Sequence, residues 1–276
     1  MELSRLVEII ELEFPPITAW SDDSIGLQIS NSKSRIKNVF LTLELNESII
    51  EEAISNASDL IIAFHPLIFK PISAVNTNNR VGNLLTKLIK NDIALYVIHT
   101  NFDSHPNGTS HELSLQLGFK KVDFLVEDKN LEGYGMGAII DLDEPINTED
   151  LLRKISKLCN SPLRYNKGSK SLIKRIAILG GSGSGYISEA LNKNCDALIT
   201  ADMKYHDFHS VEGKMIVIDP GHYEMEQFVP KAMKRILDKK IGNEINFVTG
   251  RELTNPVLYF PENDYIDLQK KYLNKL

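Results

Sequence analysis

Short runs of almost wholly apolar residues alternate along this chain with segments whose apolar residues recur at helical spacing. Because these runs lack the alternation of a sheet with one solvated face, they indicate strands that are buried on both faces. The helical segments between them are the crossovers that parallel strands require. The chain is therefore expected to be an α/β protein whose largely parallel sheets are covered by helices. The expected strands are residues 39–43, 60–64, 93–98, 135–142, 176–179, 197–200 and 215–218.

The ends of several helices are marked by residues with known capping preferences. A helical period over residues 3–10 predicts a first helix that Pro15 and Pro16 stop. Asn46 is placed to cap a helix through residues 49–54, and Asn147 with Asp150 resembles a capping box before a helix over 151–159. The remaining helices are expected at residues 81–89, 109–117, 187–191 and 228–237.

A chain of 276 residues gives a prior of two domains or one large α/β domain. The charged, weakly periodic stretch 126–133 is the favoured seam between two α/β lobes. We therefore expect a first lobe of residues 1–125 plus about 225–276, and a second lobe of residues 126–224.

Composition limits the classes of partner and compartment. With 31 Lys and Arg against 37 Asp and Glu, the net charge of −6 argues against nucleic-acid binding through a broad surface. Cys159 and Cys195 lack zinc-ribbon spacing and fit a reducing compartment. A secretory signal pattern and an apolar run of roughly 20 residues are both missing, so a cytoplasmic protein with no membrane partner is expected.

Candidate metal ligands follow the ends of the expected strands, where open α/β sheets bind ligands. His65 follows one strand and Asp103 follows the next. His222 and Glu226 follow the last strand, at a spacing that places both on one face of a helix. If these strand ends converge, the four side chains form a cluster suited to a divalent ion such as zinc, iron or manganese.

Each of these residues also has an ordinary structural interpretation. His65 could be a hydrogen-bonded core or surface residue, and Asp103 could initiate a turn. His222 and Glu226 could be an exposed helical pair. The glycine-serine stretch 180–185 could contact phosphate at a helix start, but a tight turn with close helix–strand packing is favoured about two to one.

The other histidines divide into two groups. His99 and His206 are candidates for proton transfer, because imidazole titrates near neutral pH, and with Glu226 they form the expected catalytic set. Solvent-facing positions are expected for His105, His111 and His209.

Taken in order, several short motifs resemble the NIF-three-like family, whose members are often labelled GTP cyclohydrolase 1 type 2 homologs. Each motif alone is weak, but the ordered set spans most of the chain. The motifs are Trp20 with Asp23-Ser24-Ile25-Gly26-Leu27, His65-Pro66-Leu67-Ile68-Phe69, His99-Thr100-Asn101-Phe102-Asp103, Gly180-Gly181-Ser182-Gly183-Ser184, residues 196–202 with Tyr205-His206, and Asp219-Pro220-Gly221-His222-Tyr223 with Glu226.

The resemblance implies a two-lobed fold with mixed sheets and a dinuclear metal site in the cleft between the lobes. It implies that His65, Asp103, His222 and Glu226 are the ligands, with Glu226 bridging two ions. It also implies a homo-oligomeric ring of six subunits. The cyclohydrolase label implies attack of an activated water on the purine ring of GTP, although the substrate of this chain remains open.

One departure from the family pattern concerns the second ion. Many members have His-His-Pro where this chain has Phe64-His65-Pro66, and a phenyl ring cannot bind a metal. One well-bound ion and a weak or absent second ion are therefore expected. Two functions stay open: a metal-dependent hydrolase of a small, nucleotide-like substrate, and a non-catalytic metal-binding ring that acts as an interaction or regulatory partner.

Overall fold

The computed structural model describes residues 1–120 and 122–259, which form two compact units. The first unit comprises Met1–Phe102 and Val229–Thr254, and the second begins at Asp103, ends its main part at Phe228 and includes residues 255–259. The first boundary thus differs from the expected one near residue 125. Stretch 126–133 is not a seam here, because it holds the end of a strand and the turn of a hairpin within the second unit.

The first unit is built on a five-stranded sheet in the order β1-β4-β3-β2-β11. Four neighbouring strands are parallel, and β1 joins antiparallel at one edge. The expected largely parallel sheet is confirmed here, and its last strand comes from the C-terminal part of the chain. The strands are β1 (Gly26–Ile29), β2 (Asn38–Thr42), β3 (Leu60–Ala63), β4 (Ala94–Val97) and β11 (Asn246–Thr249).

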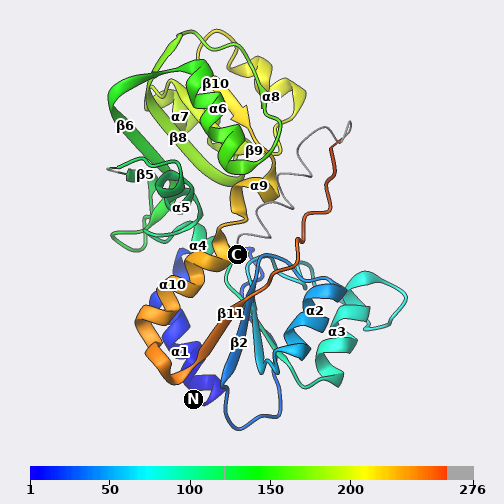
Figure 1. The fold of residues 1–276 in the computed structure, drawn as a ribbon. Helices are drawn as coiled ribbons and strands as arrows, with labels where there is room; N and C mark the ends of the chain where they lie inside the picture. Colours follow the sequence, from blue (N-terminus) through cyan, green and yellow to red (C-terminus); the bar gives the residue numbers. More distant parts are fainter. Residues whose placement is uncertain (121, 260–276) are drawn as a thin grey trace. The chain divides into compact units, whose positions relative to one another are not determined.

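Helices cover both faces of this sheet. Figure 1 shows α1 (Leu3–Glu13) and α10 (Val229–Ile241) on one side of it, with α2 (Glu47–Ser55) and α3 (Arg80–Lys90) on the other. The N-cap predicted at Asn46 is confirmed, since its side chain accepts a hydrogen bond from the Ile49 amide at 2.8 Å. The short helix α4 (Thr100–Asp103) ends where the two units divide.

The second unit contains a six-stranded mixed sheet in the order β5-β6-β8-β9-β10-β7. Its centre, β8-β9-β10, is parallel, whereas β5, β6 and β7 join antiparallel. The strands are β5 (Val122–Glu127), β6 (Gly135–Asn147), β7 (Arg164–Tyr165), β8 (Leu172–Ser182), β9 (Ala197–Ala201) and β10 (Ile216–Asp219).

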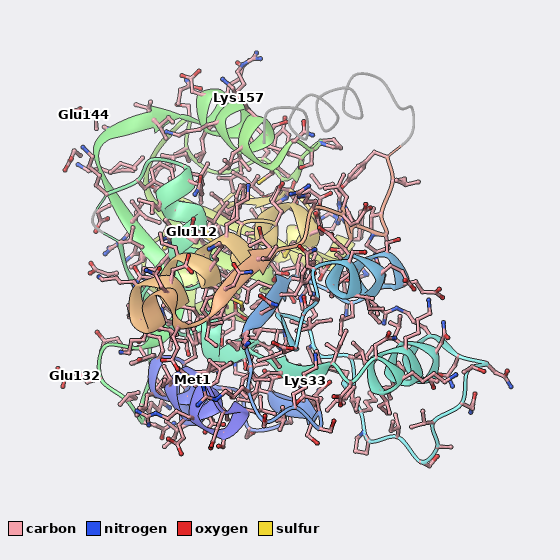
Figure 2. The ribbon with its side chains drawn as sticks, turned by 60° about the horizontal axis from the view of Figure 1, so that its bottom comes forward. Met1, Lys33, Glu112, Glu132, Glu144 and Lys157 are labelled. Atoms are coloured by element: carbon pink, nitrogen blue, oxygen red, sulfur yellow. The ribbon has the colours of Figure 1, made fainter. Side chains whose placement is uncertain are left out.

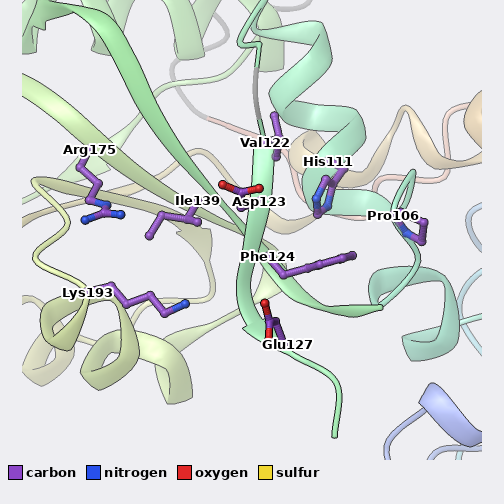
Figure 3. A pocket seen from close by; sticks show the side chains of 9 residues that line it. All are labelled: Pro106, His111, Val122, Asp123, Phe124, Glu127, Ile139, Arg175 and Lys193. Carbon is purple, nitrogen blue, oxygen red and sulfur yellow. The ribbon is translucent and has the colours of Figure 1, made fainter. Parts of the chain in front are cut away.

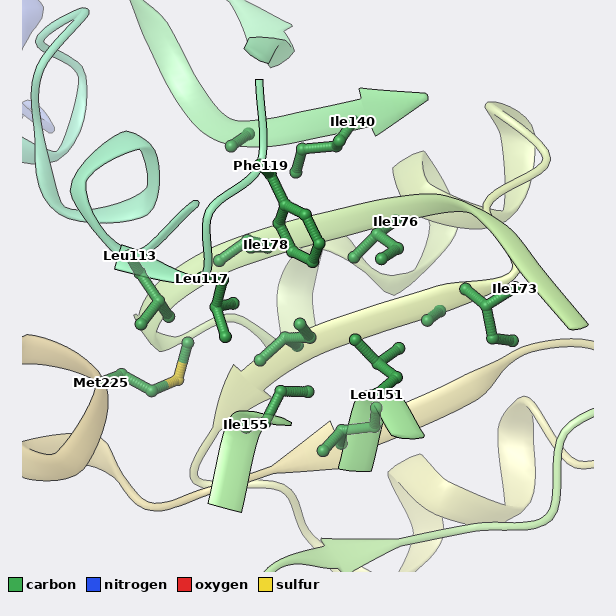
Figure 4. Close-up of a cluster of buried hydrophobic side chains, with 14 of the residues drawn as sticks. Leu113, Leu117, Phe119, Ile140, Leu151, Ile155, Ile173, Ile176, Ile178 and Met225 are labelled. Carbon is green, nitrogen blue, oxygen red and sulfur yellow. The ribbon is translucent and has the colours of Figure 1, made fainter. Parts of the chain in front are cut away.

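Two apolar clusters sandwich this second sheet. The first cluster, shown in Figure 4, packs α5 (Thr109–Gln116), α6 (Thr148–Cys159) and α9 (His222–Glu226) against one face. The second packs α7 (Ile187–Asn192) and residues around α8 (Tyr205–Ser210) against the other face. Cys159 and Cys195 are free and lie in different clusters, and burial raises the pKa of their thiols to about 12 and about 11. Such thiols are poor nucleophiles.

In both sheets a buried aspartate accepts hydrogen bonds from backbone amides at the start of a neighbouring strand. Asp59 precedes β3, and its carboxylate accepts hydrogen bonds from the amides of Lys37 (2.7 Å) and Asn38 (3.0 Å) at the start of β2. The Lys33 ammonium, labelled in Figure 2, lies 2.7 Å from the same carboxylate. One buried acid therefore satisfies two backbone donors that the strands leave open.

Asp196, which precedes β9 in the second unit, makes the equivalent hydrogen bonds. It accepts from the amides of Lys174 and Arg175 (both 2.9 Å), and the Lys170 ammonium lies 2.6 Å away. The sequence leading into each neighbouring strand also recurs, as Ser-Lys-Ser-x-Ile-Lys at residues 32–37 and 169–174. The two units thus contain matching strand–helix–strand segments.

Within the part of the chain that the structure describes, no helix is both long enough and apolar enough to cross a membrane.

Replacing Asp59 with Ala should lower the free energy of unfolding by about 1–3 kcal/mol, because two backbone amides at the start of β2 lose their acceptor. Urea unfolding followed by circular dichroism measures the change. Glu132→Ala, at an exposed loop position labelled in Figure 2, is the control and should be neutral. An Asp59→Ala protein as stable as the control would contradict this account of the strand ends.

Candidate metal centre

In the first unit, polar side chains follow the carboxyl ends of three parallel strands. Glu44, His65 and His99 come after β2, β3 and β4, in that order. The ladder continues beyond the strands, because the His65 amide donates to the Leu43 carbonyl at 2.9 Å. These three side chains therefore lie at one edge of the sheet, the edge where ligands bind in open α/β folds.

His65 is partly buried at this edge. Its Nδ1 lies 3.3 Å from Glu44 Oε1, and its ring centroid is 5.5 Å from that of His99. Phe64, by contrast, is fully buried, with ring centroids 4.9 Å from His65 and 5.2 Å from His99. The phenyl ring thus supports both imidazoles from the core side and offers no atom to a metal.

His99 is held by Asp23 of the motif that begins at Trp20. Its Nδ1 lies 2.9 and 3.0 Å from the two carboxylate oxygens of Asp23. Thr100 also donates to this carboxylate, through its amide at 3.1 Å and through its hydroxyl. Burial alone raises the pKa of Asp23, but the hydrogen bonds from His99 and Thr100 outweigh it and lower the pKa to about 2. An ionised Asp23 fixes the His99 ring and leaves Nε2 for other partners.

In the second unit, His222 and Glu226 lie at the two ends of α9. Nε2 of His222 is 3.0 Å from Oε2 of Glu226, so the predicted pairing on one helix face is confirmed. The alternative of an exposed pair is wrong, because Glu226 is only 3% exposed. On its other side, Nδ1 of His222 is 2.6 Å from Oδ2 of Asp202, which follows β9.

The pKa of His222 is far from the ordinary value of a histidine. Burial alone lowers the pKa of His222, but the carboxylates of Glu226 and Asp202 outweigh burial and raise it to about 10. In the absence of another cation, the proton of the imidazolium supplies the positive charge that the two carboxylates require. A divalent cation could take over that role.

Gly181 makes the space for this pair. Its φ of +62° is left-handed, and an added Cβ would lie 2.5 Å from Glu226 Oε1 and 3.2 Å from His222 Nε2. Two further glycines of the stretch are also packed closely, since a Cβ on Gly180 would meet Thr109 at 2.4 Å and one on Gly183 would meet Thr200 at 2.3 Å. β8 continues to Ser182, so the first glycines belong to the strand and not to a turn. The close packing favoured from the sequence is confirmed for these glycines, whereas the tight turn expected with it is wrong for Gly180 and Gly181.

The remaining site residues are placed separately. Asp103 is partly buried at the end of α4, with its Oδ1 atom shielded from solvent. His206 is exposed on α8, its ring against that of Tyr205, and within the described ranges no hydrogen bond or ion pair links it to His222 or Glu226. The geometry therefore gives His99 a fixed orientation but gives His206 none.

Two of the three histidines expected to face solvent do not. His105 is buried, with its Nδ1 accepting from the Asn107 amide at 3.0 Å. His111 is partly buried with its ring 4.6 Å from that of Phe124, and burial together with the charge of His105 lowers its pKa to about 4. His209 is exposed, as predicted.

A pocket of about 400 Å³ lies in the second unit around β5. Figure 3 shows His111 and Phe124 on one side of this strand and Arg175 and Lys193 on the other. The candidate metal ligands do not line it. The pocket is therefore lined by other residues than the expected ligands.

The residues of the second unit fit a divalent metal. The buried carboxylate of Glu226 faces an imidazole nitrogen, and a residue without a side chain lies beside both. Mixed imidazole and carboxylate donors suit zinc, iron and manganese. Asp202 on the far nitrogen of His222 matches the outer carboxylate that metal-binding histidines commonly have.

Comparisons with known proteins agree with the resemblance seen in the sequence. The model of the family described as Duf34/NIF3 (NGG1p interacting factor 3) matches residues 1–256. The chain is 30% identical to a GTP cyclohydrolase 1 type 2 homolog of Clostridium perfringens and 32% identical to one of Lactococcus lactis, each over 93% of this chain and 98% of the relative. The crystal structure of Staphylococcus aureus protein SA1388 aligns with a TM-score of 0.87 at 27% identity, over 94% of this chain and 99% of that one.

The Asp23 network makes a prediction about acid stability. Since the folded-state pKa of Asp23 lies below its unfolded value, its stabilisation is present above about pH 4 and is lost as the pH falls through about 2. Asp23→Asn should therefore cost about 2 kcal/mol of unfolding free energy at pH 6 and progressively less toward pH 2. Urea unfolding at several pH values tests this, and an equal cost at every pH would contradict it.

Proposed function

The chain belongs to the Duf34/NIF3 family, and from this premise we propose that it binds a divalent metal and acts as a metal-dependent hydrolase on a small, nucleotide-like substrate. The proposed ligands are His65, Asp103, His222 and Glu226. The observation that carries the proposal is the buried Glu226 carboxylate facing His222 Nε2, beside a glycine that leaves room for both. The name of the relatives, GTP cyclohydrolase 1 type 2 homolog, makes GTP the first substrate to assay.

The chain's own residues have distinct roles in this proposal. A divalent ion would supply a Lewis acid and an activated water. Glu226 and His222 would hold the ion, with His65 and Asp103 as the further proposed ligands. His99, whose Nδ1 is fixed by Asp23, would transfer a proton through Nε2. His206, exposed and without a comparable anchor, is a weaker candidate for the same step.

Phe64 is the basis for the proposed number of ions. In the position where many family members have a histidine, this chain buries a phenyl ring completely. We propose that one ion binds tightly and that a second, if supplied in excess, binds weakly through the remaining ligands.

Metal content tests the ligand set. Protein purified without a histidine tag and dialysed against zinc, iron or manganese should hold about one ion per chain. His222→Ala and Glu226→Gln should each lose most of the bound metal, and His65→Ala should also bind less of it than the wild type. Two tightly held ions in the wild type, or full retention of metal and activity in Glu226→Gln, would contradict the proposal.

The glycine beside the site gives a second test with a matched control. Gly181→Ala should weaken metal binding at least tenfold, because the new methyl group displaces Glu226 and the left-handed backbone is strained. Gly185→Ala is the control, since its Cβ would meet no atom within 4 Å. Isothermal titration of both metal-free variants measures the difference, and equal affinities would contradict the assigned role of Gly181.

A second candidate function is a non-catalytic metal-binding ring of six subunits that serves as an interaction or regulatory partner. The buried Phe64 favours it, because it removes a ligand that a second ion would use. A panel of nucleotides and phosphoesters with added zinc, iron or manganese separates the two. Turnover that disappears in Glu226→Gln supports the hydrolase, whereas no turnover with a metal-dependent rise in melting temperature supports the second function. The mass of the native particle tests the ring.

A further inference from the structure

Asp202 stands apart from the residues that the sequence suggested as ligands. It follows β9 in a left-handed conformation, with a φ of +57°, and its Oδ2 lies 2.6 Å from Nδ1 of His222. In the matching segments of the two units, His65 and Asp202 occupy the same place, each six residues after the buried aspartate that precedes the middle strand. Each unit therefore presents one polar side chain at this point of its sheet.

We propose that Asp202 is a positioning residue for the metal site, which holds His222 through Nδ1 so that Nε2 faces Glu226 and the ion. This inference rests on the proposed function, since it requires that His222 binds a metal. Asp202 itself is not proposed as a ligand.

The geometry of the imidazole carries the argument. A histidine can bind a metal through one nitrogen only when that nitrogen is unprotonated, so the proton must be on the other. In this structure Nδ1 points to Asp202 and Nε2 points to Glu226. A carboxylate that accepts a hydrogen bond from Nδ1–H fixes this tautomer, fixes the ring orientation and makes Nε2 a better electron-pair donor to the metal.

Burial separates the two carboxylates that contact His222. The Glu226 side chain is 3% exposed, whereas that of Asp202 is 51% exposed. The buried carboxylate is thus on the metal-facing side of the ring, and the exposed one is on the solvent side. An exposed ion pair of merely structural value would contribute little to stability and nothing to metal affinity, so the two roles predict different measurements.

The left-handed backbone decides which substitutions are informative. Alanine is disfavoured at this φ, but glycine and asparagine adopt it readily. Asp202→Gly therefore removes the carboxylate with little backbone strain. Asp202→Asn keeps an oxygen that can accept a hydrogen bond from Nδ1–H but lacks the negative charge. Glu132→Ala, at an exposed loop position of the same unit, removes a carboxylate that contacts no part of the site.

The experiment measures zinc affinity of the metal-free proteins by competition with a chelator. Asp202→Gly should bind zinc about 10–100-fold more weakly than the wild type, Asp202→Asn should lose less, and Glu132→Ala should be unchanged. Long-range ¹H–¹⁵N spectra of the zinc-loaded proteins should show the proton on Nδ1 of His222 in the wild type and in Asp202→Asn. In Asp202→Gly the same proton should exchange with solvent faster, because no carboxylate accepts its hydrogen bond. The metal-free variants should melt at the wild-type temperature.

The outcomes separate this inference from the proposed function. If His222→Ala loses zinc but Asp202→Gly binds as tightly as the wild type, the positioning role is wrong and the metal site stands. The role is also overturned if both Asp202 variants lose zinc affinity and their metal-free forms melt well below the wild type, because the loss would then reflect a destabilised fold. If the wild type binds no zinc, iron or manganese, the proposed function itself fails, and the inference fails with it.

Discussion

Burial of the central parallel strands on both faces is the constraint on which the rest of this structure depends. Strands such as β3 and β9 consist of residues that are fully or almost fully buried, so they have no face on which to carry functional side chains. Polar groups are therefore placed just beyond the strands. At the amino ends, Asp59 and Asp196 bind open backbone amides. At the carboxyl ends, His65 and Asp202 begin the loops that could meet a ligand.

Both units use the same means to orient an imidazole. His99 is held through Nδ1 by Asp23, and His222 is held through Nδ1 by Asp202. In each case the carboxylate comes from a different loop than the histidine, so Nδ1 of the ring is fixed by a tertiary contact. The consequence is that Nε2 of each ring is directed without help from a bound ion. Side chains held in this way need little reorganisation to bind a ligand.

The sequence was sufficient for features that depend on neighbouring residues. The cap at Asn46, the strands that end before His65 and His99, and the pairing of His222 with Glu226 follow from local spacing and were predicted. The helix that contains Pro230 was also expected, and it forms because proline is tolerated in the first turn.

Features that depend on distant partners could not be predicted in this way. The observed boundary between the units differs from the predicted one because β5 pairs with β6. The charged stretch 126–133 gives no sign of this pairing in the sequence. His105 and His111 looked like surface residues because their own segments are polar, yet neighbouring elements cover them. The edge strands β1, β7 and β11 are short, and each forms beside a strand that is remote in the sequence.

One signal of long-range order was nevertheless present in the sequence. The repeated Ser-Lys-Ser-x-Ile-Lys segments, each followed by a strand and then by an aspartate before the next strand, mark the corresponding parts of the two units. When the two segments are aligned, Asp202 and His65 fall at equivalent positions, although one is an acid and the other an imidazole. The two units have thus kept one way of fixing their strands while the residues beyond the strands differ. One unit has an imidazole at this position, and the other has the carboxylate that orients an imidazole of its own.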